Sequence, residues 1–124
     1  MEFELTQNML NIYKEVRLSD LSLNKDFIIC SEITIDYNVI ADRNITIKDN
    51  GCLICKKFIC GCLFHKGDCK VVIETCGMIK CKDFETLYNL DFKNHGIIDC
   101  LTMTYKTTNG SLINYNDGII VTKS

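Results

Sequence analysis

The side chains most able to do chemistry lie close together in the middle of the chain. Cys60, Cys62, His65 and Cys69 offer three thiols and one imidazole at short intervals. These are ligand types that zinc prefers, and short loops help a chain fold around one ion. The spacing Cys-x-Cys-x2-His-x3-Cys matches no standard zinc ribbon or knuckle. We therefore expect no metal or other cofactor, and we keep zinc on these four residues as the alternative.

A nucleophilic thiol is the second chemistry that this segment suggests. A reactive cysteine needs a pKa lowered by nearby positive charge or by a base. Lys56, Lys57, Lys66 and Lys70 surround the cysteines, and His65 is near. The sequence offers no third group to orient a base, and it contains no phosphate-binding loop, nucleophile elbow or spaced carboxylate pair. We expect a protein that is not an enzyme.

The nine cysteines have a simpler structural explanation. Residues 1–10 are acidic at the start and contain no apolar run of the kind found in secretory signals, so we expect a cytoplasmic protein with reduced thiols. Free cysteine packs as a small hydrophobic residue and is often buried. The chain contains no apolar run of 18 residues, so no membrane-spanning helix is predicted. At 124 residues with 24% charged side chains, the chain is expected to form one domain over residues 1–124.

A repeated pattern places several of these cysteines at equivalent positions. Each of the glycines at 51, 77 and 96 is followed by an apolar residue after two positions and by a cysteine after four. Apolar residues also precede each glycine: Ile45, Val71 and Leu90 lie six positions before, and Ile47, Ile73 and Phe92 lie four positions before. The apolar residues two positions after the glycines are Leu53, Ile79 and Ile98. The cysteines four positions after them are Cys55, Cys81 and Cys100. A weaker copy surrounds Gly118, and residues 33–41 resemble another copy without the glycine. Period-2 alternation predicts two strands around one glycine corner in each unit.

Stacked repeats of this length predict an all-β fold, a small parallel β-helix over residues 27–122 with equivalent side chains in ladders. An antiparallel β-meander or barrel is the alternative, because a three-residue loop ending at each glycine also keeps apolar pairs on one face.

The first segment of the chain follows a helical period instead. Leu5, Met9, Ile12 and Val16 are spaced to share one helix face, and Thr6 is a suitable N-cap. We expect an amphipathic helix within residues 1–20 that covers an open end of the β-helix, since an exposed sheet edge invites unwanted pairing.

The coil pattern of residues 27–122 resembles right-handed β-helix architecture, including the bacterial bactofilins and pectin-lyase-like folds. Similarity to bactofilins implies a small, cytosolic, non-catalytic protein that polymerises with itself. This chain differs from them in its cysteine content and its N-terminal helix. Polysaccharide-cleaving β-helices are longer and use clustered acids or arginines, whereas this chain has two arginines, Arg17 and Arg43, outside the repeated units.

The cysteine-rich segment is also basic, although the whole chain has a net charge of −2. Residues 51–82 contain 6 lysines and 2 acids. The interval between Gly51 and Gly77 is longer than the next one, which predicts an inserted loop between Lys56 and Cys69, and inserted loops often carry function. The candidate binding residues are Lys56, Lys57, Lys66 and Lys70.

These observations favour a non-catalytic β-solenoid that binds an acidic protein or assembles with itself. The abundance of lysine, isoleucine and asparagine is typical of an AT-rich genome, and a phage or viral protein that binds a host factor fits this expectation. We expect neither a membrane nor nucleic acid as partner, since aromatic residues beside the lysines are few. The alternative is a zinc-stabilised module that contacts nucleic acid or an acidic protein through residues 56–82.

Overall fold

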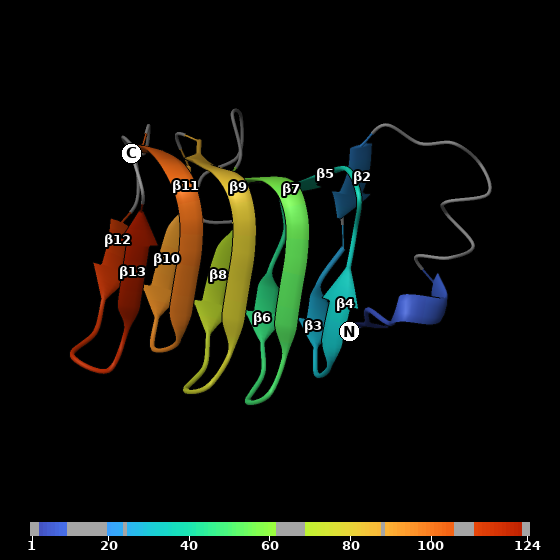
Figure 1. Cartoon of the computed structure of the whole chain (residues 1–124), viewed down its shortest axis with the longest axis horizontal. Helices are drawn as coiled ribbons and strands as arrows, with labels where there is room; N and C mark the ends of the chain where they lie inside the picture. The colour runs from blue at the N-terminus through green and yellow to red at the C-terminus, as the bar shows by residue number, and fades with distance from the viewer. Residues whose placement is uncertain are drawn as a thin grey trace.

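The chain folds as a parallel β-solenoid of about five coils, seen side by side in Figure 1. The computed structural model describes residues 3–9, 20–23, 25–61, 69–87, 89–105 and 111–122. Every strand pairing in these residues is parallel. The predicted β-helix is therefore confirmed, and the antiparallel meander or barrel is wrong.

One sheet forms a single flat face, which we call face A. Its six strands follow the order β1-β3-β6-β8-β10-β12. Their bounds are β1 (Phe3–Glu4), β3 (Phe27–Ile29), β6 (Ile45–Ile47), β8 (Lys70–Ile73), β10 (Asp91–Asn94) and β12 (Ser111–Asn114).

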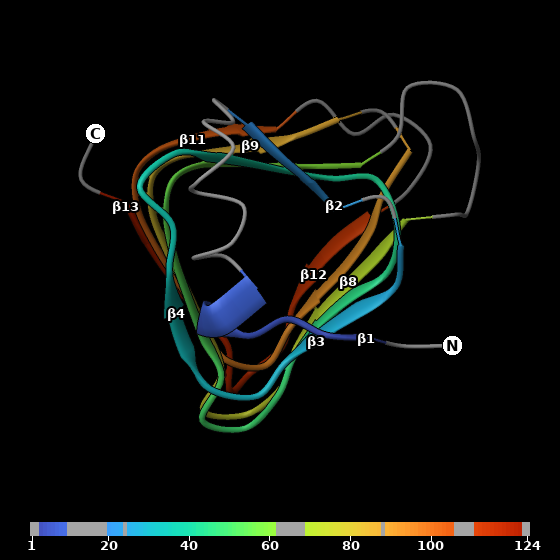
Figure 2. The same ribbon diagram turned by 90° about the vertical axis from the view of Figure 1, so that its right-hand side faces the viewer.

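The second sheet bends around a corner and forms two faces. Its order is β13-β11-β9-β7-β5-β2, and β4 also pairs with β7. The bounds are β2 (Asp20–Leu23), β4 (Glu32–Thr34), β5 (Asn38–Ala41), β7 (Cys52–Cys60), β9 (Met78–Thr86), β11 (Ile97–Tyr105) and β13 (Ile119–Thr122). Strand β4 pairs with the first part of β7 and β5 with its second part. We call these parts face B and face C; together with face A they give the triangular outline of Figure 2.

The coils are numbered from the N-terminal side. Coil 1 contains β3, β4 and β5, coil 2 contains β6 and β7, coil 3 contains β8 and β9, coil 4 contains β10 and β11, and coil 5 contains β12 and β13. Inward side chains of successive coils form apolar ladders, because a period-2 strand turns alternate residues toward the core. Three phenylalanines sit at the centre: Phe84 stacks on Phe58 and meets Phe92 edge-on, each with ring centroids 5.5 Å apart.

The repeated glycines lie at the corner between faces A and B, where successive coils come very close. A Cβ added to Gly96 would lie 2.2 Å from the carbonyl oxygen of Gly77. Glycine is thus required by contact with the coil below it. The left-handed backbone positions fall one residue earlier, at Asn50 with φ 66° and Cys76 with φ 68°.

The predicted register holds after each glycine and fails before the third one. Leu53, Ile79 and Ile98 align, and all three are fully buried. Before Gly96, however, Val71 pairs with Phe92, not with Leu90.

A shorter corner in coil 4 causes this shift. Strand β10 continues to Asn94, which pairs with Ile73 and lies two residues before Gly96. The side chain of Asn94 accepts a hydrogen bond from the Gly96 amide at 3.0 Å, in place of the backbone carbonyl that Gly77 uses. Its amide group donates to Asn114 at 2.8 Å and to the Ile119 carbonyl at 3.2 Å, so this fully buried polar side chain is satisfied.

Two expectations about the first part of the chain need correction. Residues 33–41 do form a copy of the repeated unit, but its register is shifted. Ile33 pairs with Leu53, so Ile33 occupies a position after the corner of its coil. Strands also begin before residue 27, at Phe3–Glu4 and Asp20–Leu23, inside or beside the segment expected to be helical.

The N-terminal helix is short in the described residues. Residues 7–9 form a helical turn, and the Met9 amide donates to Thr6 Oγ1 at 3.3 Å, which confirms Thr6 as the N-cap. Leu5 is buried and Met9 packs against the core at the N-terminal end of the solenoid. Ile12 and Val16 lie outside the described residues.

Candidate functional site

The predicted lysine loop begins later than expected. Lys56 and Lys57 belong to strand β7, which continues to Cys60, so the insertion can start only after that residue. Lys66 lies outside the described residues. Lys56 sits at the bend between faces B and C and is exposed.

Acidic residues accompany the lysines that can be placed. Lys57 Nζ lies 3.4 Å from Glu85 Oε2 and is in register with Asp83. Lys70 is exposed and is in register with Asp91. The basic character of this segment in the sequence is therefore partly balanced by neighbouring coils. Binding of an acidic partner through Lys56, Lys57, Lys66 and Lys70 stays a prediction.

The candidate zinc ligands divide into two groups. Cys60 and Cys69 are fully buried, whereas Cys62 and His65 lie outside the described residues. Cys69 Sγ contacts the carbonyl oxygens of Ala41 at 3.6 Å and Arg43 at 3.4 Å, and burial, followed by the neighbouring Cys69 thiol, raises the pKa of Cys60. In the described ranges, no three acids, cysteines or histidines converge on a metal position.

The cysteine ladder at the bend matches its prediction. Cys55, Cys81 and Cys100 are in register, buried and without disulfide bonds. A hydrogen bond with the Cys55 thiol, and then burial, raise the pKa of Cys81, while burial raises the pKa of Cys100 to about 11. The three thiols border an outer groove of about 290 Å³. A raised pKa disfavours the thiolate, so the ladder fits core packing better than nucleophilic catalysis.

The corner between faces A and B carries one polar cluster that the sequence did not identify. His95 Nδ1 lies 3.0 Å from Asp117 Oδ1, and the Thr75 hydroxyl donates to the other carboxylate oxygen at 3.2 Å. The rings of His95 and Tyr115 stack at 3.9 Å. The hydrogen bond from His95 lowers the pKa of Asp117. These contacts join coils 3, 4 and 5 across the short corner of coil 4, which is a structural role.

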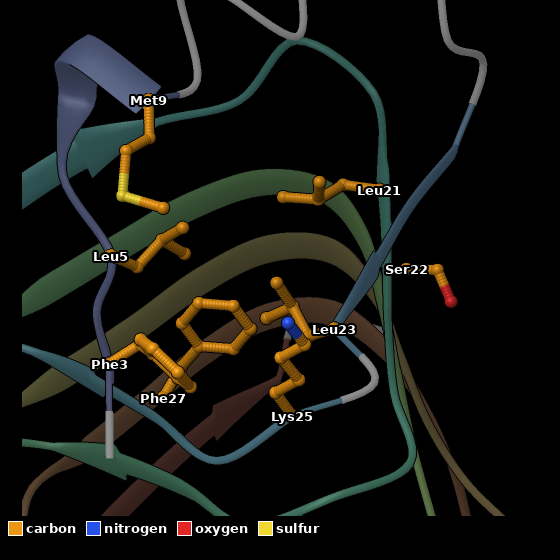
Figure 3. A pocket seen from close by; sticks show the side chains of 8 residues that line it. All are labelled: Phe3, Leu5, Met9, Leu21, Ser22, Leu23, Lys25 and Phe27. Carbon is orange, nitrogen blue, oxygen red and sulfur yellow. The ribbon is translucent and has the colours of Figure 1, made fainter. Parts of the chain in front are cut away.

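The N-terminal end contains a cleft of about 380 Å³ (Figure 3). Leu5, Met9, Leu21 and Leu23 point toward one another in it, and Ser22 points away. Lys25 Nζ lies 5.4 Å from the centre of the Phe3 ring. We interpret this mainly apolar cleft as the place where the N-terminal segment packs against coil 1.

The most distinctive surface is at the opposite end of the solenoid. We define the C-terminal rim as residues 101–105, 111–114 and 119–122, the outermost strand segments of faces C, A and B. No strand in the described part of the chain pairs with their outer edges. Among the rim side chains whose exposure the structure describes, the exposed large hydrophobic ones are Leu101, Tyr105, Ile113, Ile119 and Val121, with exposed fractions of 40–51%.

The C-terminal rim also lacks charge. None of its residues is Asp, Glu, Lys or Arg, although 24% of the chain is charged. The equivalent strands of coil 3 contain Lys70, Lys80, Lys82, Asp83 and Glu85. Exposed edge strands in proteins are normally protected by charge, short length or proline. A sequence signal for this surface existed in the weaker repeat around Gly118, whose strands are uncharged.

Comparisons with protein-family models, with curated proteins and with solved structures found no match for this chain. In the residues that the structure describes, no helix is both long and apolar enough to cross a membrane.

Proposed function

We propose that this protein is a cytoplasmic, non-catalytic association module that binds a protein through its C-terminal rim. One observation carries the proposal: the outermost strands of all three faces carry exposed large hydrophobic side chains and contain no Asp, Glu, Lys or Arg. Unpaired backbone donors and acceptors on such an edge can accept another strand, and this β-augmentation is a common mode of protein recognition. A host factor bound by a phage or viral protein would be a partner of this kind.

Lysine substitution at the rim tests the proposal. Ile119 and Val121 point outward on β13, so Ile119→Lys with Val121→Lys should leave the fold intact, since exposed substitutions have small effects on stability. The matched control places two lysines on outward positions of face B away from the rim, at Thr34 and Met78.

The readout is quantitative capture of proteins from the native host. We expect the parent and the control to retain the same partner, and the rim variant to lose it at least tenfold. Equal capture by all three would refute the rim as the binding surface. If the partner is lost only after charge reversal at Lys56 and Lys70, the lysines bind it and the rim does not.

The alternative function is a zinc-stabilised module, and the neighbouring Cys60 and Cys69 thiols are the one observation in its favour. The test is metal content after purification without added zinc. We expect well under one metal per chain, and unchanged folding in chelator. Stoichiometric zinc that disappears together with folded structure in Cys60→Ser would establish the zinc module, because structural zinc sites unfold without their ion.

A further inference from the structure

We propose that the partner of the C-terminal rim is a second copy of this chain, joined rim to rim about a two-fold axis. This inference rests on the proposed function and makes it specific. It predicts a closed dimer, not the filament that similarity to bactofilins implies.

The absence of charge favours a second copy. A two-fold interface brings the same patch of both subunits together, so each charged residue on it would meet like charges of the other copy. Like charges directly opposite each other on paired strands are destabilising. An uncharged rim whose exposed large side chains are isoleucine, valine, leucine and tyrosine avoids this repulsion and is complementary to itself.

The N-terminal end disfavours a head-to-tail filament. Strand β1 covers the edge of β3, and β2 covers the edge of β5. The Gln7 side chain accepts from the Thr34 amide at 2.8 Å and donates to the Thr34 carbonyl at 3.2 Å, which occupies the edge of β4. Of the strands left outermost, β1 has only 2 residues and contains the exposed Glu4, and β2 contains Asp20; charged residues on an edge disfavour an added coil.

Side-chain alternation limits the registers that the dimer can have on face B. A two-fold axis makes β13 pair with its own copy in antiparallel orientation, and directly opposite residues must lie on the same side of the sheet. Ile120 faces the core and Ile119 and Val121 face outward. Of the registers that this allows, we infer the one that places Ile120 opposite Ile120 of the second copy, because it also pairs Ile119 with Val121.

This register buries what the single chain leaves exposed. Ile120 is only partly buried, although Leu53, Ile79 and Ile98 on the same ladder are fully buried. The dimer supplies Ile120 with the neighbour that every inner coil already has. It also joins two Ile119–Val121 pairs into one outer apolar patch.

Light scattering on the 124-residue chain tests the dimer. We expect the parent and the Thr34→Lys/Met78→Lys control to have twice the 14.2 kDa mass of one chain, and Ile119→Lys/Val121→Lys to be a monomer at the same concentration. A parent that is monomeric at every concentration would overturn the dimer. An open series of larger species would overturn the two-fold arrangement, because it indicates head-to-tail assembly.

Engineered disulfides test the register. Opposite residues in antiparallel strands have Cα atoms about 4.5–5.5 Å apart, which a disulfide can bridge. In a background with Cys30→Ser, Cys62→Ser and Cys76→Asn, we expect Ile120→Cys to form a covalent dimer on mild oxidation. Ile119→Cys should not, since its copy lies roughly two residues further along the strand. Equal cross-linking by both variants would refute the register.

The two proposals fail in different ways. If the parent is a monomer but the rim variant still loses a host protein that the control retains, the proposed function stands and the dimer is refuted. If the rim variant matches the parent in both light scattering and capture, both are refuted.

Discussion

The two ends of the solenoid differ in whether their outermost strand edges are covered. At the N-terminal end, β1, β2 and the Gln7 side chain cover the strand edges of coil 1 on all three faces. At the C-terminal rim, the described residues leave these edges uncovered and place apolar side chains beside them.

This difference shows where the molecule can associate. Every stacked coil needs a neighbour on both sides to satisfy its backbone and cover its core. The chain supplies that neighbour at the N-terminal end from β1, the Gln7 side chain and β2. At the other end, an external strand would have to supply it, and the missing charges remove the usual barrier to such pairing.

The largest effect is expected from removing the N-terminal cover. Deletion of residues 1–17 removes β1, Leu5, Gln7 and Met9, so it exposes the core of coil 1 and two strand edges. We expect aggregation, measured by light scattering. A monodisperse truncation with an unchanged melting temperature would show that this segment does not act as a cover.

A corner-glycine substitution compares coil 2 with coil 5. A Cβ on Gly51 would lie 2.2 Å from the Ile29 carbonyl oxygen, and one on Gly118 would lie 2.3 Å from that of Asn94. We expect Gly51→Ala to lower the free energy of unfolding by about 1–3 kcal/mol, as overpacking does. Gly118→Ala should cost less, because within one chain coil 5 has a neighbouring coil on one side only and its corner can shift.

Urea denaturation monitored by circular dichroism measures both losses. An equal loss in the two variants would mean that coil 5 is held as rigidly as coil 2. Gly77→Ala is a useful intermediate, since its closest contacts are 3.0 Å.

Thiol labelling can show from which end the solenoid opens. Cys30 and Cys76 are exposed and should react at once, whereas the ladder of Cys55, Cys81 and Cys100 should react only after opening. If coils separate from the C-terminal rim, the labelling rate should fall in the order Cys100, Cys81, Cys55. Each 1.4 kcal/mol of opening free energy corresponds to about tenfold in rate. Peptide mapping by mass spectrometry gives the order, and the reverse order would indicate opening from the N-terminal end.

A smaller effect is expected from Gln7→Ala, which uncovers the edge of β4. Two exposed hydrogen bonds to Thr34 are lost, each with a net contribution of about 0.5–1.5 kcal/mol. Amide exchange at Thr34 should become faster in this variant. Gln7→Glu is the matched control, because it keeps the acceptor for the Thr34 amide. Unchanged exchange in both variants would rule out protection by Gln7.

The smallest effect is expected at the corner of coil 5, from Asp117→Asn. The hydrogen bond from His95 lowers the pKa of Asp117, so the folded state favours the carboxylate. The stabilisation is present above the ordinary carboxyl pKa of about 3.9 and is lost as pH falls through the lower folded value. Thermal unfolding should therefore show a slightly lower melting temperature for the variant at pH 7 and no difference at strongly acidic pH. A difference that persists in acid would have another cause.

Much of the coil could be predicted from local sequence. Glycine followed by alternating apolar residues located the corner, the strands after it and the ladder of Cys55, Cys81 and Cys100. These features depend on side-chain alternation and on the small size of glycine, which are visible in a few consecutive residues. The same pattern could not separate parallel from antiparallel pairing, because both keep apolar residues on one face.

The register of coil 4 required the tertiary structure. By spacing, Leu90 is the residue that should pair with Val71, but Phe92 pairs with it. The corner of coil 4 is shorter, because the Asn94 side chain accepts the hydrogen bond from the Gly96 amide in place of a backbone carbonyl. The lysines show the same limit. The sequence predicted that Lys57 belongs to a basic loop, whereas the fold places it in β7 beside Glu85, which lies 28 residues later.

The sequence by itself determined the repeating unit, its buried faces and the uncharged character of the last strands. Only the tertiary structure decided that those strands form an end with open edges, and that the first residues cover the opposite end. The physical reason is that an edge is defined by the neighbour it lacks. Backbone groups are present in every residue, and whether they are paired depends on where distant coils lie.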